Sequence, residues 1–190
     1  MRVRGRRVTL FTVLGLLMMS CMLPGMIPLK SEPEGPMPYM EEDAEKMLET
    51  VQGGGANLLE LLAPERYTEA DLAKPGTWTY TVTVMDDSPT YLIYGWCATG
   101  QETLQQNFEH IDVNIYFNDE ELVNEVVHII TYTSPENNMP CQAFIVLMSE
   151  WPEGNYILEA VATFDEKIND GLADYAAGDY ASVYNVTVKK

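Results

Sequence analysis

A group of side chains with metal-ligating oxygen atoms lies near the carboxyl end of the chain, between residues 165 and 179. It consists of Asp165, Asn169, Asp170, Asp174 and Asp179. Carboxylate and amide oxygens are the ligands that Ca²⁺ takes in proteins. The segment therefore predicts a weak calcium site, while no cofactor is expected to be obligatory. The alternative is a solvated loop in which Asn and Asp side chains cap turns.

Residues 99–110 form a second segment whose side chains could contact a ligand. Thr99 and Glu102 have the spacing of a capping box, and Leu104 and Phe108 are four residues apart. This pattern predicts a short helix with one inward face and an amide-rich outward face. The candidate ligand-binding residues are two outward glutamines and a tyrosine of the acidic segment: Gln101, Gln105 and Tyr175.

Catalytic chemistry finds little support in the sequence. The two histidines, His110 and His128, have no zinc-like helical spacing to other ligands, although His110 and Asp112 could share one face of a strand. A Gly-x-Ser-x-Gly motif is absent from the sequence. Carboxylates are too numerous for any one pair to identify a glycosidase. We expect no catalytic residues and a protein that is not an enzyme.

The charge of the chain excludes two classes of partner. Four of the 11 basic residues lie in the first seven positions, so the part after Ser20 holds seven basic and all 29 acidic residues, a formal charge of −22. Phosphate recognition needs clustered Lys and Arg, but Arg66 is the only arginine after the amino-terminal region. We therefore expect neither nucleic acid nor nucleotide as a partner.

Alternating and β-branched runs separated by turn residues begin at Thr77. In the first run Trp78, Tyr80, Val82 and Val84 alternate with threonines, which gives one buried and one solvated face. We expect an all-β domain over residues 77–190. Its seven strands are predicted at 77–85, 91–98, 111–117, 123–132, 141–149, 155–164 and 180–188.

Residues 154–158 resemble the start of the sixth strand of immunoglobulin-like and fibronectin-type sandwiches, where a Tyr packs at a corner and a core residue follows two positions later. Tyr156 and Leu158 match these positions. The resemblance implies a single immunoglobulin-like antiparallel β-sandwich of about seven strands, with segments 99–110 and 165–179 at the same end. The run Gly95-Trp96-Cys97, followed by Cys141 and Trp151, is also similar to a type of uncharacterised exported bacterial domain.

The amino terminus has the three parts of a secretory signal: a basic start, an apolar run over residues 8–19, and Ser20-Cys21. Residues 17–21 resemble the lipobox of bacterial lipoproteins, with Met18 where Leu is usual. The resemblance implies a signal peptide over residues 1–20 and lipid attachment at Cys21. A plain cleavable signal, or an anchor extended through Leu29, is the alternative.

Three cysteines in an exported protein leave one unpaired. If Cys21 carries lipid, Cys97 and Cys141 remain as an even pair in an oxidising compartment, and a disulfide between them is expected. The alternative is two buried free thiols.

An acidic tether is expected over residues 21–76, because prolines dominate its start and glycines occupy 53–55. Helical spacing predicts a short amphipathic helix over 41–51, and Thr68 with Asp71 predicts one helical turn. These short helices could dock on the domain or bind a partner.

Taken together, these features predict an exported, lipid-anchored cell-surface binding module on the extracytoplasmic side of the membrane. Its partner is an unknown protein or a glycan. The main alternative is an accessory carbohydrate-binding domain, and an enzyme ranks third.

The lipidation hypothesis has a direct test. Replacing Cys21 by alanine should release the protein from membranes, because the only acyl-accepting thiol of the lipobox-like segment is removed. Metabolic labelling with a radioactive fatty acid measures the attachment. Labelling that is equal in wild type and Cys21→Ala would contradict lipidation at this residue.

Overall fold

The computed structural model describes residues 36–190. Cys21 and the predicted signal peptide lie outside this part of the chain. Within it, no helix is both long enough and apolar enough to cross a membrane. Residues 36–190 belong to one compact unit.

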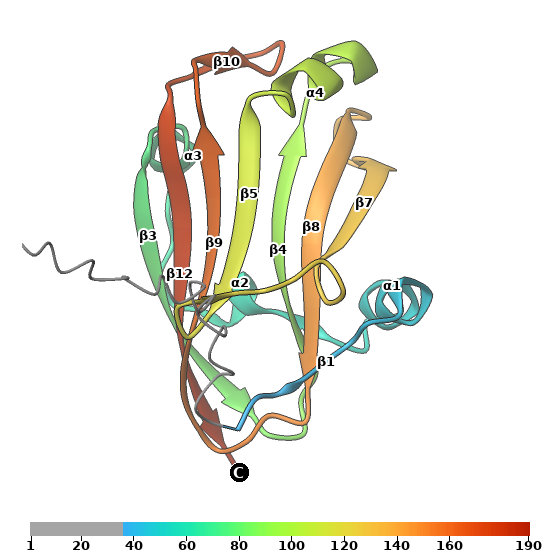
Figure 1. Ribbon diagram of the computed structural model, residues 1–190, viewed down its shortest axis with the longest axis vertical. Coiled ribbons are helices and arrows are strands. Elements are labelled where there is room, and N and C mark those ends of the chain that lie inside the picture. The colour runs from blue at the N-terminus through green and yellow to red at the C-terminus, as the bar shows by residue number, and fades with distance from the viewer. Residues whose placement is uncertain (1–35) are drawn as a thin grey trace, which may run out of the picture. The chain divides into compact units, whose positions relative to one another are not determined.

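The structure confirms an all-β domain, in which two five-stranded sheets pack face to face (Figure 1). The sheet centred on β8 is named here the β8 sheet, and the sheet centred on β9 and β12 is named the β12 sheet. The β8 sheet contains β8 (Pro140–Ser149), β7 (His128–Thr133) and β1 (Tyr39–Met40) along one edge of β8, and β4 (Thr90–Cys97) and β2 (Asn57–Leu58) on the other side. The β12 sheet contains, in order, β3 (Gly76–Met85), β12 (Gly178–Lys189), β9 (Gly154–Phe164), β5 (Ile111–Phe117) and β6 (Glu120–Glu121).

The alternation seen in the sequence decides which face of each strand is buried. In β3 the side chains of Trp78, Tyr80, Val82 and Val84 are buried, while the intervening threonines face solvent. These residues pack with buried residues from the inner faces of both sheets, and together they form one hydrophobic core. Burial of apolar surface on this scale is the main force that holds the sheets together.

The expectation of a purely antiparallel sandwich was wrong at two strand pairs. β3 runs parallel to β12, with Tyr80 opposite Tyr184, and β2 runs parallel to β4. After Met85 the chain crosses to the other sheet to form β4, so β3 and β4 do not form a hairpin. β3 is therefore free to pair with the last strand of the chain.

The strand predicted at 123–132 begins later than expected, at His128. The backbone amides of Val126 and Val127 both donate to the carbonyl of Val123, so these residues form a turn. Asn124 and Glu125 lie inside that turn. The β-branched valines favoured a strand over these residues, but the turn hydrogen bonds delay the start of the strand to His128.

The helix predicted over 41–51 is α1 (Ala44–Gln52), which begins after Asp43. The Asp43 carboxylate accepts from the amides of Glu45 and Lys46, which satisfies two free donors at the helix start. Met47 is fully buried and packs on Ala143, Ile145 and Leu147. The helix thus covers the outer face of β8, which explains why this strand is apolar on both faces.

Two shorter helices follow, α2 (Leu59–Leu62) and α3 (Glu69–Leu72). The capping box predicted from Thr68 and Asp71 is present at the start of α3. Between the helices, the Tyr67 hydroxyl donates to the Thr79 carbonyl and accepts from the Thr79 amide, over 2.8 and 3.0 Å. The Tyr67 side chain therefore satisfies backbone groups at the edge of β3. An unpaired strand edge would invite another strand to add to the sheet.

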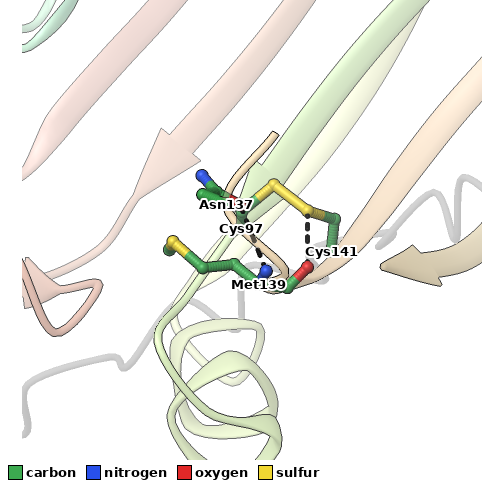
Figure 2. Close-up of a disulfide and its surroundings, with 4 residues drawn as sticks. All are labelled: Cys97, Asn137, Met139 and Cys141. Atoms are coloured by element: carbon green, nitrogen blue, oxygen red, sulfur yellow. Dashed lines mark hydrogen bonds between the residues drawn. A yellow bond between two sulfur atoms is a disulfide. The ribbon is translucent and has the colours of Figure 1, made fainter. Parts of the chain in front are cut away.

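The predicted disulfide is confirmed: Cys97 of β4 is bonded to Cys141 of β8 (Figure 2). The two residues are directly opposite in the register of the strands, with their Cα atoms 4.1 Å apart. The bond therefore joins neighbouring strands of one sheet. It closes the chain segment that holds α4 (Gln101–Asn107), β5 and β7.

Replacing both Cys97 and Cys141 by alanine should lower the free energy of unfolding by ~2–5 kcal/mol, because the unfolded chain loses its largest constraint. Urea denaturation of the oxidised protein and the double variant measures the difference. Two free thiols in a peptide map of the exported protein would contradict the bond.

Candidate binding surface at the loop end

Two segments that are far apart in the sequence meet at one end of the domain, as expected. One holds α4, and the other holds the short strands β10 (Ile168–Asn169) and β11 (Asp174–Tyr175), which form a hairpin (Figure 1). The Thr99 amide donates to the Asp170 carbonyl over 2.8 Å. The Asn107 side-chain amide donates to the Asn169 carbonyl over 3.1 Å. We call this joined surface the loop end.

A third link joins the bases of the two segments. The Asp165 amide donates to the His110 carbonyl over 3.1 Å. The His110 ring nitrogen Nδ1 lies 2.9 Å from the Asp165 carboxylate, and Nε2 lies 3.4 Å from that of Glu166. His110 therefore links the start of β5 to the end of β9 at the surface. Its two partners are the carboxylates of Asp165 and Glu166.

The predicted helix is present, but its predicted capping box was wrong. Gly100 is the residue before the helix, and no side chain caps it. Thr99 instead faces the hairpin, where Gly171 approaches it closely with φ +95°. A Cβ atom on Gly171 would lie 1.8 Å from the Thr99 hydroxyl oxygen. The absence of a side chain at Gly171 is therefore what lets the two segments touch.

Asp170 organises the hairpin from inside. One carboxylate oxygen accepts from the backbone amides of Leu172 and Ala173, each over 2.7 Å, and the other accepts from the Tyr175 hydroxyl over 3.2 Å. The side chain is buried. A buried carboxylate is tolerated when its oxygens are hydrogen-bonded in this way.

The remaining predicted calcium ligands are divided between two sites. Asp174 accepts from Lys167 and from the Asn169 side chain, each over 2.8 Å, and the bond from Lys167 is the main cause that lowers the pKa of the Asp174 carboxyl. Asp179 accepts from the Thr163 hydroxyl over 2.8 Å on neighbouring strands. Over residues 36–190 no three His, Cys, Asp or Glu side chains gather in a metal-binding arrangement. Calcium binding stays a prediction.

The predicted ligand-binding residues differ in their exposure. Gln101 and Gln105 lie exposed on α4, as the helical spacing indicated. Tyr175 is partly buried, and its ring packs edge-on against Trp96 with the centroids 4.7 Å apart. Its ring thus packs on Trp96 and lines the pocket between the sheets.

Sequence reasoning missed a group of aromatic side chains on the inner faces of three strands. They are Trp78 and Tyr80 of β3, Tyr94 and Trp96 of β4, and Tyr180 and Tyr184 of β12. Each pair lies two or four residues apart, which is the spacing of one face of a strand. That repeated spacing was the available signal.

Comparisons with known proteins give no assignment. The sequence matches no family model. It also matches no curated protein. Among solved structures, it is similar to PbICP-C in its complex with falcipain-2, with 13% identity over 62% of this chain and 92% of that one and a TM-score of 0.35. It is also similar to the cysteine protease inhibitor EhICP2 of Entamoeba histolytica, with 11% identity over 61% and 96% and a TM-score of 0.29. Likenesses at these TM-scores carry no inference about this chain.

Replacing Gly171 by alanine should lower the free energy of unfolding by ~1–3 kcal/mol, because the new methyl group meets Thr99 and the backbone is left-handed. Gly76→Ala is the matched control, since a Cβ there meets no atom within 4 Å. Urea denaturation of both variants measures the effect. Equal stability of the two variants would contradict the close contact.

Proposed function

We propose that this chain is a non-enzymatic, exported binding module that is anchored to the membrane by a lipid on Cys21 and contacts a partner protein through the loop end. The observation that carries the proposal is the joining of two distant segments into one surface. The bonds from Thr99 to Asp170 and from Asn107 to Asn169 fix their relative position. A surface fixed before binding loses less conformational entropy when a partner docks.

We also propose that the domain is an immunoglobulin-like sandwich. Its main strands have the orders β7-β8-β4 and β3-β12-β9-β5-β6, which correspond to the two sheets of such domains. The Tyr156 hydroxyl donates to the Pro152 carbonyl over 2.9 Å, and Leu158 is fully buried, which supports a tyrosine corner. The disulfide departs from that family, because it joins β4 to β8 within one sheet.

The position of the loop end supports the choice of site. In sandwiches of this class the loops that connect the strands at one end form the variable binding surface, while the sheets hold them in place. Here Gln101 and Gln105 project from α4 at that end. Both are amides that can donate and accept hydrogen bonds, which suits contact with a polypeptide.

The charge of the chain favours a basic or neutral partner over an anionic one. The segment after Ser20 carries a formal charge of −22, so phosphate-rich partners are repelled. A basic or neutral protein face is favoured. A glycan remains the rival partner, and Tyr175, the ring predicted to stack on a sugar, packs edge-on against Trp96.

Site-specific photocrosslinking in the host cell tests the proposal. A photoreactive amino acid at Gln105 should form a discrete protein adduct, because this side chain lies exposed at the loop end. The same group at Gln52, which is exposed at the end of α1, is the matched control. The expected result is an adduct at Gln105 that Gln52 does not give.

The same adducts at both positions would contradict a binding surface at the loop end. A glycan array covers the rival partner. Saturable binding to one defined sugar, lost in the Gln101→Ala, Gln105→Ala double variant, would replace the protein partner by a glycan at the same surface.

A further inference from the structure

A cavity of about 240 Å³ lies between the two sheets, and Tyr175 of the hairpin is one of its lining residues. Its walls are built mainly from aromatic side chains. They include Trp78, Tyr80, Tyr94, Trp96, Tyr180 and Tyr184. A cavity of this size accommodates a small ligand and falls below the volume typical of drug-sized ligands.

The rings hold one another in place. Tyr80 and Tyr184 are stacked, with centroids 4.7 Å apart and planes 10° apart. Tyr67 packs edge-on against Tyr80 from the outside, and its own hydroxyl is held by Thr79. The aromatic wall therefore has a fixed geometry before any ligand enters.

The charge in the cavity has one sign. Glu60 of α2 is the single charged residue among those that line it, and no Lys or Arg is present among them. Burial raises the pKa of Tyr80 to about 12, and the Glu60 carboxylate adds to this effect. The pKa of Tyr184 is raised by the same two causes in the same order. The Glu60 carboxylate is therefore the charge beside the aromatic wall, and a carboxylate among aromatic rings favours a cation.

A second observation points to a ligand with an acceptor atom. The indole nitrogen Nε1 of Trp96 is buried and donates to no atom among the described residues. Trp96 as a whole is 9% exposed and lines the cavity. A buried N–H donor without a partner is costly, so an acceptor on a bound molecule would stabilise it.

We propose that this cavity binds a small organic cation of the methylated ammonium class, one that also carries a hydroxyl or carboxylate oxygen. Its positive group lies against the aromatic wall near Glu60, and its oxygen accepts from Trp96. Recognition of quaternary ammonium groups by cages of aromatic rings is the physical basis. The proposal does not depend on the partner proposed for the loop end.

A neutral sugar fits the cavity less well. A sugar would be bound by polar groups, and two of the hydroxyls in the wall are already used. Tyr175 donates to Asp170, and Tyr180 donates to the Ala176 carbonyl over 2.9 Å. Glu60 and Ser182 are the non-aromatic polar side chains that line the cavity.

Tryptophan fluorescence and calorimetry of the detergent-solubilised full chain test the proposal, with choline as the probe. Trp78 and Trp96 line the cavity, whereas Trp151 packs on Phe117 and Tyr156 elsewhere in the core. We expect a saturable fluorescence change with choline. The uncharged isostere 3,3-dimethylbutan-1-ol, which has the same shape without the charge, should bind ~10-fold more weakly or not at all.

Glu60→Gln should weaken choline binding ~10-fold, since it removes the carboxylate, and Glu60 is exposed, so the isosteric change should leave the fold intact. Glu49→Gln, on the exposed face of α1, is the matched control and should bind as wild type does. Equal affinity for choline and its neutral isostere, equal affinity in the two variants, or tighter binding of methyl glucoside would each overturn the proposal. The comparison of choline with its neutral isostere uses the wild-type protein and no crosslinking. Failure of choline binding would therefore leave the crosslinking result at the loop end unaffected.

Discussion

The parallel pairing of β3 with β12 is the constraint on which the rest of the domain depends. It places Tyr80 opposite Tyr184 and brings Trp78 and Tyr180 into contact, with their ring centroids 6.1 Å apart. The chain can reach this arrangement only because it leaves β3 for the other sheet and returns to the same sheet at its end. The pairing joins two strands that are about a hundred residues apart in the sequence. It places the aromatic side chains of β3 and β12 side by side, which forms the aromatic wall between the sheets.

The loop end is a second consequence of the same topology. β9 and β12 are neighbours and antiparallel, so the connection between them must turn back at one end of the domain. β4 ends and β5 begins at that end, which brings α4 against the hairpin. Asp170 then completes the arrangement, because its carboxylate satisfies amides inside the hairpin while its carbonyl accepts from Thr99. A surface built in this way uses backbone groups and the single α4 side chain of Asn107, which leaves the exposed Gln101 and Gln105 free to contact a partner.

Much of this fold could be predicted from local sequence, and the failures are non-local. The alternation at Trp78 and Tyr80 gave the buried face of β3, and Thr68 with Asp71 gave the start of α3, because both signals act over a few residues. The partner of β3 could not be predicted, since a strand's neighbour depends on the path of the whole chain. For the same reason Tyr175 was expected to bind a ligand beside Gln101 and Gln105, whereas its hairpin packs the ring onto Trp96. Asn169, Asp170 and Asp174 come together in the hairpin, whereas Asp165 and Asp179 bond to His110 and Thr163, and this division depends on the strand register.

Amide hydrogen exchange at Thr99 tests most directly whether the loop end is one fixed surface. The Thr99 amide lies outside both sheets and donates to Asp170, across the gap between the two segments. If the segments are held together in solution, this amide should be protected to an extent comparable with the amides of the adjoining strand β4. Exchange at the rate of an unstructured peptide would show that the two segments move independently, and it would contradict the binding surface proposed for this protein.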